Sequence, residues 1–256
     1  MTYIKLNKDN IASSHICCGF SDKKIKESYE AKKQWMTSSF DEGYVFQRLD
    51  ERAKVFIEYR PVENAWVPVK AENFMMLGCL WVSGKYKKQG HAKALLNKAV
   101  EAAKEKKMLG CLAVVGKKKF HFMSDGKWLL KNGFEILDES PSGFLLLGLL
   151  FDDVKVNPSF SQSVKVGKSY EKEDFVVYYS NQCPFAEYHV LNSFVETAKE
   201  KKLSYKIIKL DEESSKLAPS PATIFSMFYK GEFLTTDLSI CMISRFDKTL
   251  EKALKK

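Results

Sequence analysis

A loop with two glycines joins an apolar segment to an amphipathic one near the middle of the chain. The apolar segment covers residues 74–82, the loop runs from Gly84 to Gly90, and apolar residues then recur at helical spacing over residues 91–106. A strand, a glycine loop and a helix in this order turn backbone N–H groups toward an anion at the start of the helix. The pattern therefore predicts a phosphate-binding site.

The side chains of this loop suit a phosphate-rich cofactor. Gly90 permits a positive φ or a close backbone approach, and Ala92 is small enough to leave room for phosphates. Lys87, Lys88 and Lys93 add positive charge at the same place. Taken alone, the loop also fits a simple strand-to-helix turn with exposed lysines.

Two segments carry a family resemblance. Residues 80–96 resemble the acetyl-CoA signature of GNAT acyltransferases, a strand that leads into Arg/Gln-x-x-Gly-x-Gly/Ala, with Lys87, Gly90 and Ala92 at its three fixed places. Residues 128–134 read Trp-Leu-Leu-Lys-Asn-Gly-Phe and resemble the second signature, aromatic-x-Lys-x-Gly-Phe. The two segments follow each other at a family-like separation, so the resemblance extends over most of the first 150 residues.

The resemblance implies an α/β (α+β) GNAT fold with a mixed, splayed sheet over residues 1–155. It also implies transfer of an acetyl group from acetyl-CoA to an unknown primary amine, by direct attack on the thioester. The strand end would hold the pantetheine arm and the thioester carbonyl, and the loop amides would hold the diphosphate. The residues implied in cofactor binding are Leu80, Val82, Lys87, Lys88, Gln89, Gly90, His91, Ala92 and Lys93.

The catalytic residues are less well marked. Many family members have a tyrosine, the general acid for the leaving thiolate, where this chain has Leu129. Glu58 and Glu63 lie near expected strand ends and are candidate bases, although both also fit ordinary solvated carboxylates. The missing tyrosine leaves open a second hypothesis, a CoA-binding sensor or adaptor without turnover.

Four further positions have a functional and a structural interpretation. Tyr59 and Trp66 fit either an acceptor pocket or the core. His121 has a side chain that titrates near neutral pH, but it also fits a surface histidine. Cys17 and Cys18 lie side by side and fit either the cleft or small buried apolar residues.

Several elements are expected to support the site. Apolar spacing predicts a helix over residues 22–40, with Ser21 as its N-cap. The remaining expectations are a hairpin of residues 44–49 and 54–59, a strand at 110–115, a short helix at 124–131, and strands at 134–137 and 144–151.

Residues 156–174 are polar and lack periodicity, which predicts a linker. Beyond it, the expected order is strand 175–179, helix 184–201, strand 205–210, hairpin 223–235 and helix 239–255. This order resembles a small thioredoxin-like domain, residues 175–256. In that resemblance residues 220–223, Ser-Pro-Ala-Thr, stand at the cis-proline element.

Cys183 precedes Pro184 at the first strand-to-helix junction of this domain, where a helix N-terminus lowers a thiol pKa. Cys183 is therefore a possible reactive thiol, although the segment to Ala186 lacks a resolving cysteine, and Cys241 in the last expected helix is not placed to be one. The alternatives are a thiol-binding module and a docking module with an inert cysteine. A GNAT domain followed by such a domain resembles the bacterial YoaP-like acetyltransferases.

Composition limits the other classes. The formal charge is +9 over 256 residues, but no nucleic-acid motif accompanies the lysines, so a phosphate cofactor is the expected partner. Six cysteines without C-x-x-C spacing predict reduced thiols and no metal site. The absence of a membrane-length apolar run and of a secretory signal predicts a cytoplasmic protein. The oligomeric state stays open.

Overall fold

The computed structural model describes residues 2–118, 120–121, 123–151 and 156–255, and its centre is a seven-stranded mixed sheet. Only the central pair of strands, β5 and β6, is parallel, and the other neighbours are antiparallel. The strands in spatial order are β1 (Tyr3–Lys5), β2 (Val45–Leu49), β3 (Val55–Pro61), β5 (Phe74–Val82), β6 (Gly110–Gly116), β8 (Phe144–Leu150) and β7 (Glu135–Glu139).

Helices cover both faces of this sheet. α2 (His91–Glu105) and α3 (Gly126–Leu130) pack on one face, over a core that includes Leu95 and Leu129. α1 (Lys26–Ser39) packs on the other face, and the 3-10 turn η1 (Lys23–Ile25) precedes it. The turn is capped by Asp22, which accepts from the Lys24 amide; the expected cap, Ser21, was off by one residue. None of the helices in the described part of the chain is long and apolar enough to cross a membrane.

The sheet opens in its middle, which confirms the expected splay. β5 and β6 pair from Phe74 with Gly110 to Leu77 with Ala113, and both strands then continue beyond the pairing. At the point of separation the register between β3 and β5 shifts, so that two residues of β5 stand opposite Glu58 of β3. A bulge of this kind bends a strand and turns its later side chains to the other face.

The expected linker is folded and buried in part. It contains β9 (Ser159–Phe160), paired with β4 (Val69–Lys70), and α4 (Gln162–Val166), whose Val164 joins a core cluster of the main sheet. The sequence did not predict this packing, because the segment is mostly polar and only a few of its side chains turn inward. The expected domain boundary at residue 155 lies outside the described residues.

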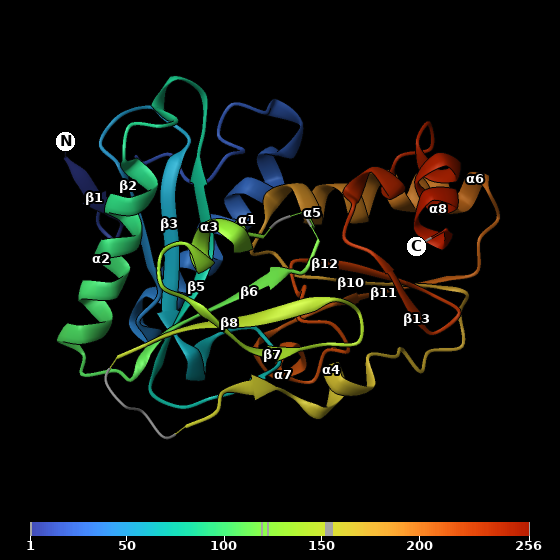
Figure 1. Ribbon diagram of the computed structural model, residues 1–256. Coiled ribbons are helices and arrows are strands. Elements are labelled where there is room, and N and C mark those ends of the chain that lie inside the picture. The colour runs from blue at the N-terminus through green and yellow to red at the C-terminus, as the bar shows by residue number, and fades with distance from the viewer. Residues whose placement is uncertain (1, 119, 122, 152–155, 256) are drawn as a thin grey trace.

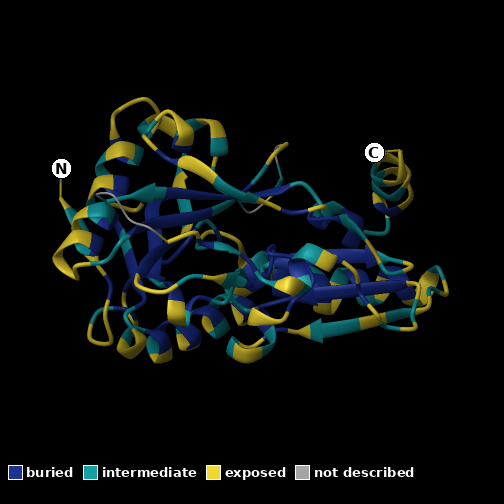
Figure 2. Cartoon of the chain, turned by 60° about the horizontal axis from the view of Figure 1, so that its bottom comes forward, coloured by how far each residue is buried: buried dark blue, intermediate teal, exposed yellow. Residues whose placement is uncertain are grey.

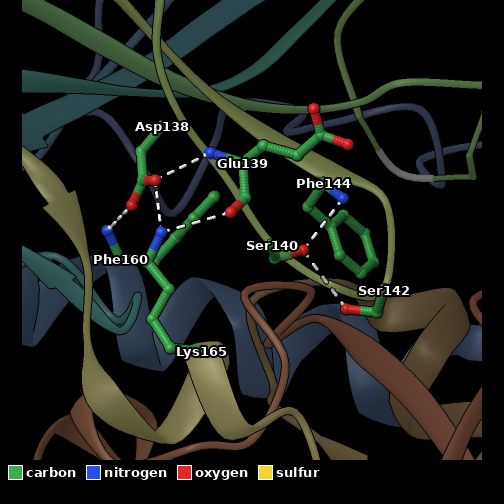
Figure 3. A network of polar contacts seen from close by, with 7 residues as sticks. All are labelled: Asp138, Glu139, Ser140, Ser142, Phe144, Phe160 and Lys165. Carbon is green, nitrogen blue, oxygen red and sulfur yellow. Dashed lines mark hydrogen bonds and ion pairs between the residues drawn. The ribbon is translucent and has the colours of Figure 1, made fainter.

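Asp138 of β7 ties this segment to the sheet. Its carboxylate accepts from the Phe160 amide at 2.8 Å and from the Lys165 ammonium, whose Nζ also donates to the Glu139 carbonyl at 3.2 Å (Figure 3). Burial raises the pKa of Asp138, but these hydrogen bonds and the Glu139 amide outweigh it and lower the pKa below its ordinary value.

The C-terminal part has a four-stranded sheet with parallel β10 and β11. Its strands in spatial order are β11 (Tyr205–Lys209), β10 (Phe175–Tyr179), β12 (Phe225–Tyr229) and β13 (Glu232–Thr235). Its helical elements are α5 (Pro184–Tyr188), the π-helical η5 (His189–Phe194), α6 (Val195–Glu200), α7 (Glu212–Lys216), η6 (Leu238–Cys241) and α8 (Phe246–Leu254). The thioredoxin-like description stays a prediction.

Two details of this part differ from expectation. The described chain has no cis peptide bond, so the bond before Pro221 is trans rather than cis. Cys241 lies in the turn η6, ahead of the last helix, and is fully buried.

The C-terminal part packs against the main sheet on the side away from α2 (Figure 1). Phe233 of β13 contacts Phe144 of β8 with ring centroids 5.2 Å apart, and the two residues share a hydrophobic cluster. The Thr223 hydroxyl donates to the Trp66 carbonyl at 2.6 Å. Buried strands therefore form a continuous interior through both sheets (Figure 2).

Candidate active site

The loop between β5 and α2 has a backbone that only a few residue types adopt easily. Gly84, Lys88 and Gly90 have φ values of +61°, +62° and +83°. Gly90 is the residue directly before α2, where its left-handed conformation turns the chain into the helix. Nothing lies within 4 Å of the position that a Gly90 Cβ would occupy, so the requirement for glycine here is conformational.

The first turn of α2 offers backbone amides that the helix does not use. The first bond of its ladder runs from the Ala94 amide to the Gly90 carbonyl at 3.0 Å. The amides of His91, Ala92 and Lys93 precede that bond and therefore have no acceptor within the helix. They add to the positive end of the helix dipole, as an anion site requires.

A hollow of about 390 Å³ lies over this turn. The charged side chains Lys87, Lys88 and Lys93 border it, and Lys93 donates to Asn132 Oδ1 at 2.9 Å across it. The other lining residues are Val82, Tyr86, Gly90, His91, Ala92, Trp128 and Asn132. Amides, lysines and the open strand end thus meet in one place.

The other residues implied in cofactor binding have distinct surroundings. Leu80 and Val82 lie on β5 beyond the splay, half-buried against the α2 side of the core. Gln89 turns away and donates to the Lys85 carbonyl at 2.6 Å. The His91 imidazole is buried, with Nδ1 2.8 Å from the Tyr3 hydroxyl, so only its backbone faces the hollow as a binding group.

The position expected for the general acid belongs to the core. Leu129 is 1% exposed and packs under α2. A phenol that the sequence did not single out, Tyr86, borders the hollow and donates to Glu51 Oε2 at 2.5 Å. The sequence signal that could have identified Tyr86 is its position inside the glycine loop.

Glu58 lies at the splay, in a buried ion pair. Its carboxylate accepts from Lys32 Nζ at 2.6 Å, and the two side chains are 8% and 3% exposed. Burial alone would lower the pKa of Lys32, but the Glu58 charge raises it well above its ordinary value. Burial also raises the pKa of the neighbouring Tyr44, and the Glu58 charge adds to that effect. Lys32 therefore stays an ammonium, and it pairs with the Glu58 side chain beside the gap in the sheet.

Glu63, the other candidate base, does not lie at the splay. It follows β3 in the turn η3 (Val62–Asn64), and its carboxylate accepts from the Asn73 amide at 2.6 Å. Asn73 lies directly before β5, at the end of that strand opposite to the loop. A strand of this length spans about 25 Å, so Glu63 fixes a turn remote from the loop.

Cysteines from three segments gather on the α1 side of the splay. Cys17 and Cys79 pack in the cluster under α1, and Cys183 lies close enough to Cys79 and Lys32 to interact electrostatically. Burial raises the pKa of Cys183 to about 11, because it outweighs the amides of Phe185 and Ala186. Burial and the helix N-terminus thus act on this thiol in opposite directions, and its reactivity stays a prediction.

The remaining candidates divide between core and interface. Tyr59 is buried in the α2-side core, and Trp66 packs against the cluster under α1. The His121 amide donates to Thr236 Oγ1 at 3.3 Å, where the two parts of the chain meet. Among the described residues, no three His, Cys, Asp or Glu side chains are arranged to hold a metal ion.

A splayed mixed sheet with a phosphate-type loop before its central helix defines the class of this protein, and sequence comparison agrees. A model of the acetyltransferase (GNAT) family matches residues 9–118, and a YoaP-like model matches residues 205–248. The chain belongs to the GNAT acetyltransferase family. It is similar to a Bacillus subtilis (strain 168) protein described as uncharacterized N-acetyltransferase YoaP, with 41% identity over 251 residues, 98% of each chain.

Solved structures with a similar fold include two N-acetyltransferases. PaiA N-acetyltransferase from Thermoplasma acidophilum, in complex with coenzyme A, has 16% identity and a TM-score of 0.40, over 59% of this chain and 100% of its own. Ribosomal-protein-alanine N-acetyltransferase from Brucella melitensis has 12% identity and a TM-score of 0.42, over 59% and 100% of the two chains. Both similarities leave about two fifths of this chain unmatched.

Proposed function

We propose that this protein transfers the acetyl group of acetyl-CoA to a primary amine by direct attack of the amine on the thioester. The observation that carries the proposal is the meeting of unused α2 amides, three lysines and the open end of β5 around one hollow. Amides and lysines suit a diphosphate. The strand edge beyond Leu77 has backbone groups available for the amide-containing pantetheine arm.

Glu58 is the proposed base. It faces the α1 side of the sheet at the splay, where an amine could approach the thioester from the side opposite to α2. The amine loses a proton to the Glu58 carboxylate, its nitrogen bonds to the thioester carbon, and the C–S bond breaks. Because Leu129 cannot donate, the thiolate takes its proton from water, and the hydroxide that remains takes up the proton held by Glu58.

The test offers the protein acetyl-CoA with each of a panel of amines. Transfer is measured by the release of free CoA and by the mass of the product. Turnover with at least one amine supports the proposal. Tight acetyl-CoA binding without turnover on any amine would instead favour the sensor, which the buried Leu129 supports.

A cytoplasmic location is proposed as well, since all six cysteines are free, as in reducing compartments.

A further inference from the structure

Four neighbouring side chains on the α1 side of the sheet hold buried polar atoms without a hydrogen-bond partner, as does Arg48 elsewhere on that side. In the four, these atoms are the Nε1 atoms of Trp35 and Trp66, the hydroxyl of Tyr44, which lies close to Glu58, and Nε and Nη1 of Arg60. Five of the ten such side-chain atoms in the described chain thus belong to these four residues. We call them the donor cluster.

The members of the donor cluster contact one another. The Arg60 guanidinium carbon lies 5.2 Å from the ring centroid of Trp35 and 5.2 Å from that of Tyr44. The rings of Trp35 and Tyr44 are 4.9 Å apart, and those of Trp35 and Trp66 are 5.6 Å apart. The unpartnered atoms therefore belong to one place in the core.

All the unpartnered atoms of the donor cluster can donate a hydrogen bond. Indole and guanidinium nitrogens only donate, and the Tyr44 hydroxyl can donate as well. A buried donor left without an acceptor destabilises the folded state, so such groups point to a missing partner. Arg60 has one ion pair, with Glu42 at 3.3 Å, and burial lowers the pKa of its guanidinium. A carboxylate supplies several acceptor lone pairs and matches the planar guanidinium.

The donor cluster lies next to the proposed base. Arg60 follows Glu58 by two residues on β3, so both side chains project from the same face, about 7 Å apart along the strand. Trp66 and Cys79 pack against the same hydrophobic cluster, and Cys79 is one of the two bulge residues opposite Glu58. The donors thus begin where the amine would be deprotonated.

The C-terminal part closes this region. Thr223, in the loop before β12, donates to the Trp66 carbonyl at 2.6 Å. The same part contacts the segment before α1, where a Cβ on Gly19 would lie 3.6 Å from Pro184. The hydrogen bond from Thr223 fixes the Trp66 backbone beside the donor cluster, whose buried setting strengthens hydrogen bonds to an anion.

We propose that the acceptor is an amino acid or a similar small amine that also carries a carboxylate, and that Arg60, Trp35, Trp66 and Tyr44 bind that carboxylate while Glu58 accepts the amine proton. This proposal rests on the transfer function proposed above. It names the substrate class of the same site and gives the C-terminal part a role in building it.

The kinetic test compares acceptors in matched pairs, the proteinogenic amino acids and β-alanine against their carboxamides. We expect kcat/KM to be at least tenfold higher for the carboxylate member of the preferred pair. Arg60→Lys should reduce that ratio at least fivefold with unchanged acetyl-CoA affinity, and Trp35→Phe should reduce it less. Equal kcat/KM within every pair would overturn the proposal.

Arg48→Gln is the matched control. Arg48 is a buried arginine of β2 that donates to the carbonyls of Leu49 and Glu51, outside the donor cluster. Its loss should leave the preference for the carboxylate unchanged. A loss of preference equal to that of Arg60→Lys would overturn the specific role of Arg60.

A binding test separates this proposal from the transfer function. N-acetylated amino acids and their carboxamides are titrated while the fluorescence of Trp35 and Trp66 is followed, with Trp35→Phe and Trp66→Phe as references. Saturable binding of the carboxylates alone supports the site even if no amine is turned over, which would contradict only the transfer. No saturable change with any carboxylate would mean that buried water satisfies the donors, and would overturn the proposal.

Discussion

The proposed cofactor loop and the proposed acceptor site on the α1 face of the same sheet are built in opposite ways. In the loop, the proposed binding groups are backbone amides at the start of α2, and the residues beside them include glycine, alanine and lysine. On the α1 face, the proposed functional groups are buried side chains held by other side chains, such as Glu58 by Lys32. The first site depends on local backbone conformation and the second on long-range packing, so substitutions should affect them differently.

The largest effect is expected on the α1 face. Glu58→Gln should lower kcat about 10²–10⁴-fold, because the amine loses its base, while acetyl-CoA affinity stays the same. The variant also leaves the Lys32 ammonium unpaired, at a cost of about 3–5 kcal/mol of stability. Steady-state kinetics and denaturant unfolding measure the two effects.

The double variant Lys32→Met/Glu58→Leu is the control for this effect. It removes both charges of a buried pair together and should recover most of the lost stability. Transfer should remain as low as in Glu58→Gln. Recovery of the rate together with the stability would show that the pair is only structural.

A substitution in the loop should have a smaller effect, limited to the affinity for the cofactor. Gly90→Val forces a β-branched residue to φ +83° and should weaken acetyl-CoA binding about tenfold or more, as calorimetry can measure. Gly143→Val is a matched control, because Gly143 has φ +82° and equally open surroundings in the β7–β8 turn. Equal loss of affinity in both variants would remove the loop from the cofactor site.

The connection between the two parts should contribute a moderate amount of stability. Asp138→Asn removes the charge that Lys165 and two amides stabilise, and should cost about 1–3 kcal/mol in denaturant unfolding. Because the folded-state pKa of Asp138 is lowered, its contribution is complete above the ordinary value of 3.8 and is lost as the pH falls through the folded value. The difference in unfolding midpoint between parent and variant should therefore shrink from pH 7 to pH 3. A difference that is the same at both pH values would contradict this role.

The smallest effect concerns Cys183. With a pKa of about 11, this thiol should react with iodoacetamide at pH 7 at least about 100-fold more slowly than free cysteine. Peptide mapping by mass spectrometry measures the rate, with the unfolded chain as reference. A rate as fast as that of free cysteine would mean that burial does not control the thiol.

The difference between the two sites also explains what the sequence revealed. β5, the loop and α2 could be predicted because strand length, glycine and helical spacing are local signals. The pairing of Lys32 with Glu58 could not, since it joins positions 26 residues apart. A signal was present in the lysine itself, which takes a place in the apolar stripe of α1 with Ile25, Tyr29 and Met36.

Other features that the sequence did not predict also depend on long-range packing. β1 is three residues long and exists because it pairs with β2, and the segment with α4 is held by Asp138 and by burial of Val164. Burial raises the pKa of Cys183 by more than the amides of its helix lower it. Each of these features is decided by tertiary contacts that override local preference.

Hydrogen exchange with and without acetyl-CoA tests the central claim most directly, because it observes the amides themselves. Binding should slow exchange at the amides of residues 87–93, most strongly at His91, Ala92 and Lys93, and leave the turn at Gly143 unchanged. Saturation with acetyl-CoA that leaves these loop amides exchanging at their free rate would contradict the claim that they hold the diphosphate.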